Sequence, residues 1–178
     1  MSVEYAAIRP DSASWERLRD LAALTAGEQM IVLDKQKSYN NQLATVAVNS
    51  ERDIIGYMAQ TATYDDGIVE VGSLIVHPYY RKTGVLRVEN VSAELVRRTT
   101  KRVIMSGAQK ILAFCNPRSG PVFEGRGFKH VSLSQVPNVA LFSCYECPKK
   151  CSFPGQACCD KAYIFASPVL RSDKVELE

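Results

Sequence analysis

Five of the six cysteines in this 178-residue chain lie between Cys144 and Cys159, in the pattern C-x2-C-x3-C-x6-C-C. A C-x2-C pair places two thiolates on one turn, a spacing that suits tetrahedral zinc, and further thiolates from the same segment can complete such a site. We therefore predict a cysteine-rich insertion loop over residues 143–160 that holds one structural zinc through Cys144, Cys147, Cys151 and Cys158.

The same thiols are open to other chemistry. Their spacing is also compatible with an iron–sulfur cluster. Free thiols and disulfides are further alternatives, and no histidine lies nearby to complete a mixed site. The sixth cysteine, Cys115, stands apart in the apolar run 110–115, so we expect it to be a small core residue.

Positive charge is concentrated in one stretch. The chain has a formal net charge of +3, but residues 78–102 carry seven basic and two acidic side chains. Within this stretch the loop 77–87 (HPYYRKTGVLR) lies between an expected strand and an expected helix. Free backbone N–H groups and the dipole of that helix favour a phosphate or pyrophosphate. A solvated connecting loop is the alternative, since neither GxxxxGK[ST] nor GxGxxG occurs.

The elements that must position these residues form a single α/β domain. With 46% hydrophobic and 23% charged residues, the composition excludes intrinsic disorder, collagen-like repeats and a coiled coil. No apolar run approaches the roughly 20 residues of a membrane helix, and the first ten residues do not resemble a secretory signal. We therefore expect a cytoplasmic protein without a membrane partner.

Hydrophobic periodicity and turn residues predict strands and helices in a β-α-β-β-β order followed by alternating helices and strands. The hairpin signal Asp65-Asp66-Gly67 separates two strands, and Gly72-Ser73 interrupts the alternation of the second one, which indicates a bulge. The result is a mixed sheet with strands at 3–8, 42–48, 54–64, 68–76, 110–115, 129–133 and 161–166, and helices after 11, after 87 and around 122–126.

Two segments carry a resemblance to a known family. Residues 76–86 (VHPYYRKTGVL) resemble V-x-P-x-Y-[RQ]-x-x-G-x-[GA], motif A of the GNAT acyltransferase superfamily. Residues 116–128 (NPRSGPVFEGRGF) resemble the N-x6-Y-E-x2-GF segment of the same family. One helix and one strand separate the two motifs, as in the family, and the element order fits over residues 1–167.

The resemblance implies a mostly antiparallel sheet with a central splayed pair of parallel strands, 68–76 and 110–115, and acetyl-CoA held between them. Backbone groups of Leu74, Ile75 and Val76 are then expected to pair with the pantetheine arm. Asn116 is expected to hydrogen-bond it, or to cap the helix that follows, or both. The pyrophosphate is expected on the backbone amides of Lys82, Thr83, Gly84, Val85, Leu86 and Arg87.

Acyl transfer to an amine needs a base for the ammonium proton and donors for the oxyanion. Glu70, on the strand before motif A, is the candidate base; a solvent-facing strand glutamate is the alternative. The amide of Leu74 or Ile75, near the expected bulge, is the candidate oxyanion donor. Two residues depart from the family pattern: Phe123 replaces the usual tyrosine acid, and Leu86 replaces a small residue of the loop.

The sequence thus predicts an acyl-CoA-dependent N-acetyltransferase that transfers an acetyl group from acetyl-CoA to an unidentified amine by direct attack. The alternative is a non-catalytic GNAT-like binding module that uses a zinc-bound cysteine loop to contact protein or nucleic acid. We do not expect nucleic acid, because Lys149 and Lys150 are the only basic residues of that loop. The expected assembly is a monomer or a homodimer.

Overall fold

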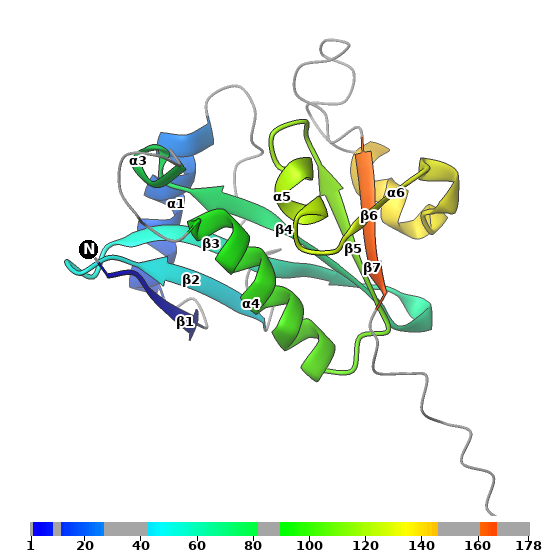
Figure 1. Cartoon of the computed structure of the whole chain (residues 1–178), viewed down its shortest axis with the longest axis horizontal. Coiled ribbons are helices and arrows are strands. Elements are labelled where there is room, and N and C mark those ends of the chain that lie inside the picture. Colours follow the sequence, from blue (N-terminus) through cyan, green and yellow to red (C-terminus); the bar gives the residue numbers. More distant parts are fainter. Residues whose placement is uncertain (1, 9–11, 27–42, 82–89, 146–160, 167–178) are drawn as a thin grey trace, which may run out of the picture.

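A computed structural model of the chain describes residues 2–8, 12–26, 43–81, 90–145 and 161–166. Seven strands form one sheet in the order β1-β2-β3-β4-β5-β7-β6 (Figure 1). Neighbouring strands are antiparallel except β4 and β5, which run parallel. The strands are β1 (Glu4–Ile8), β2 (Ala44–Val48), β3 (Ile54–Thr63), β4 (Ile68–Val76), β5 (Lys110–Cys115), β6 (Lys129–Val131) and β7 (Lys161–Ala166).

Helices cover both faces of the sheet. The first face carries α4 (Val91–Met105) and α5 (Gly120–Glu124), and the residues between them and the sheet form the largest buried apolar cluster. On the second face, α1 (Ser12–Ala26) packs over β2–β4 and α6 (Asn138–Tyr145) packs over β5 and β7, in two separate clusters. Short helical turns are α3 (Pro78–Arg81), η2 (Asp65–Gly67) and η3 (Leu133–Gln135).

The sequence of α4 explains its bounds and its packing. Asn90 caps it, since its side-chain oxygen accepts a hydrogen bond of 3.1 Å from the backbone N–H of Ala93. Leu95 is fully buried against β3, where a Cβ added to Gly56 would lie only 2.8 Å from its Cδ1 atom. Glycine at position 56 therefore lets the helix approach the sheet closely. The helix ends just before Gly107, whose φ of +97° most other residues avoid.

A bulge in β4 changes which side chains face which helices. Tyr57 pairs with Ile75 and Ala59 pairs with Gly72, so β4 has one more residue than β3 between these pairs. Ser73 takes up the insertion with a left-handed φ of 54°. Because side chains alternate along a strand, the extra residue shifts the alternation: Val71 packs under α4, whereas Ile75 packs under α1. The predicted interruption at Gly72-Ser73 is confirmed.

The predicted mixed sheet, its parallel pair and the bounds of the three strands 68–76, 110–115 and 161–166 are confirmed. Two expectations were wrong. The expected loop 77–87 begins with the short helix α3, and residues 143–145 of the expected cysteine-rich loop are helical. Helix α6 was not predicted, because its residues are almost all apolar and show no helical periodicity. No helix within the described ranges is long and apolar enough to cross a membrane.

Candidate functional site

The two parallel strands separate part of the way along their length. Their pairing runs from Ile68 opposite Lys110 to Glu70 opposite Leu112 and then stops, although β4 continues to Val76. Beyond Glu70, the edge of β4 that faces β5 is therefore not part of a ladder. The predicted splayed pair is confirmed, and Glu70 lies where the two strands part.

Glu70 projects from the face of the sheet that carries α1 and α6, because its neighbours Val69 and Val71 point under α4. Its Oε1 atom accepts a hydrogen bond of 2.8 Å from the hydroxyl of Thr61, and its Oε2 atom accepts one from the hydroxyl of Tyr64. Both carboxylate oxygens are thus held by neutral donors.

Burial raises the pKa of the Glu70 carboxyl above its ordinary value, while the hydrogen bonds from Tyr64 and Thr61 oppose that rise. A carboxylate whose pKa lies closer to neutral pH accepts a proton more effectively than a solvated one. Its role as a catalytic base stays a prediction, but its surroundings differ from those of a freely solvated strand glutamate.

Sequence reasoning missed Thr61 and Tyr64. The pairing of β3 with β4 jumps from Gln60 opposite Val71 to Ala62 opposite Glu70, so Thr61 is an extra residue in β3. Tyr64 follows the strand and closes the hairpin through its backbone N–H, which donates to the carbonyl of Ile68 at 2.8 Å. The hairpin signal at 65–67 predicts that the two strands pair, but the bulge that brings Thr61 to Glu70 leaves no mark in the sequence.

Two arginines stand at the far ends of the separating strands. Arg81, in α3 after β4, donates from Nε to the carbonyl oxygen of Val76 at 2.6 Å. Partial burial and the positive charge of Arg118, which follows β5, lower the pKa of Arg81. Neither guanidinium forms an ion pair with an acidic residue of the described part of the chain. Two like charges held near each other favour an anion between or above them.

The predicted backbone contacts of acetyl-CoA are placed in part. Leu74, Ile75 and Val76 follow the bulge, on the part of β4 that no longer pairs with β5, while Ile75 and Val76 still pair with β3. The carbonyl oxygen of Val76 already accepts from Arg81. The predicted pyrophosphate contacts Lys82, Thr83, Gly84, Val85, Leu86 and Arg87 lie outside the described residues.

Asn116 follows β5 and begins the turn that leads into α5. Its Oδ1 atom accepts from the backbone N–H of Arg118 at 3.0 Å and of Ser119 at 2.9 Å, and so holds the turn before α5. Within the described residues its Nδ2 group has no hydrogen-bond partner. The N-cap of α5 is Ser119, without a side-chain cap hydrogen bond, so the expected cap of this helix by Asn116 was wrong. The contact of Asn116 with pantetheine stays a prediction.

Phe123 has a structural role. It is 2% exposed and packs edge-to-face on Phe128, with ring centroids 5.1 Å apart. Among the other tyrosines, Tyr163 donates to Glu124 Oε1 at 3.1 Å beneath α5, and Tyr79 and Tyr80 lie in α3. The side chain of Tyr145 is not among those described.

The predicted zinc site lies mostly outside the described residues. Cys144 belongs to the last turn of α6, whereas Cys147, Cys151 and Cys158 are not described. In the part of the chain that is described, no three metal-ligating side chains come together. The zinc site stays a prediction. Cys115 is fully buried in the core under α4, as expected.

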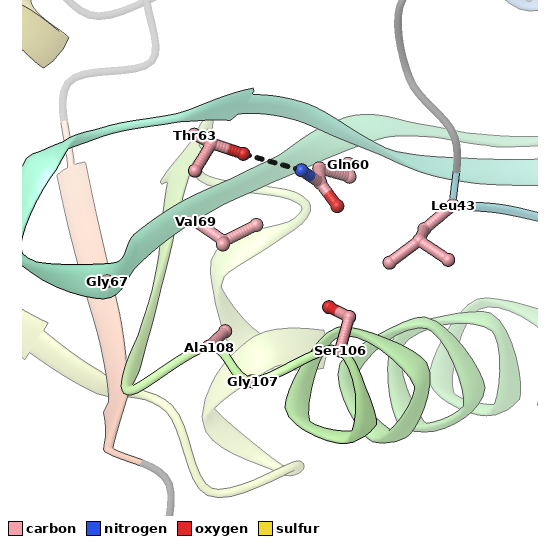
Figure 2. A pocket seen from close by; sticks show the side chains of 8 residues that line it. All are labelled: Leu43, Gln60, Thr63, Gly67, Val69, Ser106, Gly107 and Ala108. Carbon is pink, nitrogen blue, oxygen red and sulfur yellow. Dashed lines mark hydrogen bonds between the residues drawn. The ribbon is translucent and has the colours of Figure 1, made fainter.

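A hollow of about 490 Å³ lies on the face opposite to Glu70 (Figure 2). Figure 2 shows Val69 and Gln60 reaching from the sheet toward Ser106 and Ala108 at the end of α4. Its lining is Leu43, Gln60, Thr63, Gly67, Val69, Ser106, Gly107 and Ala108. None of these is a predicted site residue, so the hollow is separate from the candidate site.

No protein-family model matches the sequence, and no curated protein matches it either. Solved structures of similar fold do exist. A GNAT-family acetyltransferase from Staphylococcus aureus has a TM-score of 0.63 and 15% identity over 92% of this chain and 99% of its own. The GNAT-family N-acetyltransferase YhbS from Escherichia coli, solved with CoA, has a TM-score of 0.59 and 14% identity over 92% and 81%. The ribosomal-protein-S18-alanine N-acetyltransferase from Escherichia coli has a TM-score of 0.63 and 10% identity over 99% and 100%. The sheet with its separating parallel pair is therefore the fold of GNAT-family acetyltransferases.

Proposed function

We propose that this chain is an acyl-CoA-dependent N-acetyltransferase that transfers an acetyl group from acetyl-CoA to an amine. The observation that carries the proposal is the position of Glu70, a largely buried carboxylate at the point where β4 and β5 separate. The solved YhbS structure, which shares the fold, holds CoA. A base at the origin of the gap is where an acceptor amine would meet a thioester bound in it.

The gap offers two kinds of contact to acetyl-CoA. The unpaired edge of β4 at Leu74, Ile75 and Val76 can hydrogen-bond the amides of the pantetheine arm as an added strand would. Arg81 and Arg118, at the outer ends of the strands, attract the phosphates. The amides of residues 82–87 are the proposed pyrophosphate contacts.

The proposed reaction is a direct displacement. Glu70 accepts one proton of the incoming ammonium, and the neutral amine nitrogen then bonds to the acetyl carbon. The carbon–sulfur bond breaks, and the nitrogen releases its second proton to solvent. The amide of Leu74 or Ile75, next to the bulge at Ser73, stabilises the oxyanion. Solvent protonates the departing thiolate, because the buried ring of Phe123 carries no proton donor.

Calorimetric titration with acetyl-CoA, followed by an acetylation screen over small amines and peptide N-termini, tests the proposal. We expect saturable binding by the wild type and by Glu70→Gln, with acetyl transfer by the wild type only. Binding without transfer to any acceptor would favour the non-catalytic module. No heat and no thermal shift at millimolar acetyl-CoA would contradict both acetyl-CoA binding and the enzyme.

A structural zinc in the cysteine-rich segment is part of the same proposal. The donor set at Cys144, Cys147, Cys151 and Cys158 matches an all-thiolate tetrahedral site by residue type and spacing. Protein purified without oxygen should contain one equivalent of zinc, and Cys147→Ser should lose it. Metal-free wild type of unchanged stability would overturn this part without affecting the rest.

A further inference from the structure

We propose that Tyr64 is a positioning residue for the acyl transfer. Its hydroxyl orients the Glu70 carboxylate and keeps it ionised before the acceptor amine binds. The inference rests on the proposed function. It concerns a residue that belongs to neither sequence motif, on a hairpin at the opposite end of β4 from the pyrophosphate loop.

Hydrogen bonds from two directions fix the orientation of the Glu70 carboxylate. A glutamate side chain has three rotatable bonds, and a base is effective only when its lone pair points at the proton it takes. Here Thr61 holds Oε1 from β3 and Tyr64 holds Oε2 from the hairpin. The two donors come from opposite ends of the bulged segment 61–64, so the plane of the carboxylate is set from both sides.

Local packing and a backbone hydrogen bond hold the two donors in place. Tyr64 is anchored by its N–H bond to Ile68 and by packing of its ring in the apolar cluster beneath α6. Thr61 lies over Gly72, where an added Cβ would come within 3.3 Å of the Thr61 Cγ2 atom. The small residue at position 72 therefore leaves room for the threonine that contacts Glu70.

The described elements around Glu70 bring no charged side chain to it. Leu112 faces it from β5, and α6 contributes an apolar cluster. No charged side chain of these elements shifts the pKa of the carboxyl. Tyr64 is the titratable group that faces it. The charged residues of α1 are exposed and do not alter the pKa of Glu70; they are Glu16, Arg17, Arg19 and Asp20. Hydroxyl donors are thus what favours the ionised form against burial.

The proposal predicts a pH effect of definite sign. Removing the Tyr64 hydroxyl removes a donor to the charged carboxylate, so the pKa of Glu70 should rise further. The acid limb of the pH profile of kcat/KM should then move upward by about one pH unit in Tyr64→Phe. The activity reached on the alkaline side should fall less than the activity at neutral pH. A merely structural tyrosine would lower both alike.

The carboxyl can be followed without any substrate. We would record the side-chain 13C resonance of Glu70, assigned by its loss in Glu70→Gln, during a pH titration of the full chain. Its midpoint should rise in Tyr64→Phe and in Thr61→Val. The matched control is Thr63→Val, which removes a hydroxyl of the same strand that bonds Gln60 instead, and its midpoint should equal that of the wild type.

A measurement on the wild type covers the case in which Tyr64→Phe does not fold. The Cζ resonance of Tyr64 should titrate with the same midpoint as the Glu70 carboxyl, and a flat Cζ resonance would overturn the inference. An unchanged acid limb in an active Tyr64→Phe would overturn it as well, with the proposed function intact. Coupled NMR titrations in a protein that transfers no acetyl group would instead remove the proposed function, and the catalytic role of Tyr64 with it.

Discussion

Glu70 and Glu94 lie on opposite faces of the sheet, and their surroundings shift their acidity in opposite directions. Glu94, in the first turn of α4, accepts hydrogen bonds of 2.7 and 2.6 Å from Arg97 and one of 2.6 Å from Arg98. The bond from Arg97 above all lowers the pKa of Glu94 to about 2. Within the described residues, Glu70 has two hydroxyl partners and no cationic partner, and burial raises its pKa.

The difference separates a structural carboxylate from a chemically available one. Two guanidinium groups and the helix N-terminus stabilise the charge of Glu94. Its carboxylate therefore stays ionised and does not accept a proton at physiological pH. Neutral donors orient Glu70 without neutralising it, so its affinity for a proton survives. The same residue type thus stabilises a helix on one face and, on the other, keeps the proton affinity that the proposed base needs.

The largest expected effect is the loss of activity when Glu70 is replaced. Glu70→Gln should lower kcat/KM for acetyl transfer by about 10²–10⁴, the usual contribution of a general base, while acetyl-CoA binding is retained. The control is Glu94→Gln, which should keep the activity of the wild type. Equal loss in both variants, measured by release of free thiol, would show that Glu70 has no special role.

The next effect concerns the arginines and their contribution to acetyl-CoA binding. Arg97 and Arg98 share Glu94, whereas Arg81 and Arg118 have no acidic partner in the described ranges. Arg118→Ala should therefore weaken acetyl-CoA binding about tenfold, equivalent to about 1.4 kcal/mol. Titration calorimetry at low and high salt checks this, and Arg97→Ala, the control, should leave the Kd unchanged.

A third effect concerns the contribution of Glu70 to the folding stability of the chain. Because the folded pKa of Glu70 is raised, the folded state binds more protons, and its stability falls as pH rises from the unfolded pKa through the folded one. Glu70→Gln should remove this cost. We expect the Tm of the variant to exceed that of the wild type by about 2–4 °C near pH 8, the shift that 1 kcal/mol produces in a chain of this size. The gain should shrink near pH 4, and a lower Tm of the variant at every pH would contradict it.

The smallest effect has the opposite sign. The pKa of Glu94 is depressed to about 2, so its contribution is present above the unfolded pKa and is lost as pH falls through about 2. Glu94→Gln should destabilise the chain at pH 7 by less than about 1 kcal/mol, since both arginines are about half exposed and solvent screens the pair. Urea denaturation at pH 7 should show the loss, and 0.5–1 M salt should reduce it.

Much of the fold could be predicted because its signals are local. The run at 110–115, the hairpin at 65–67 and the interruption at Gly72-Ser73 each depend on neighbouring residues and on backbone preferences. Helix α6 was not predicted, because an apolar stretch without periodicity is equally compatible with a strand, a buried helix or a loop.

Individual residues of the candidate site could be predicted only where they belong to a family motif or to a recognisable strand. By itself the sequence determined one α/β unit, a basic stretch at 78–102 and a glutamate on the strand before it, because composition, charge order and periodicity are properties of the chain. Only the tertiary structure decided that β4 and β5 part at Glu70 and that Thr61 and Tyr64 hold its two oxygens. Burial and hydrogen bonding across two bulged strands set the acidity of that carboxyl, and both arise only when segments distant in sequence are packed together.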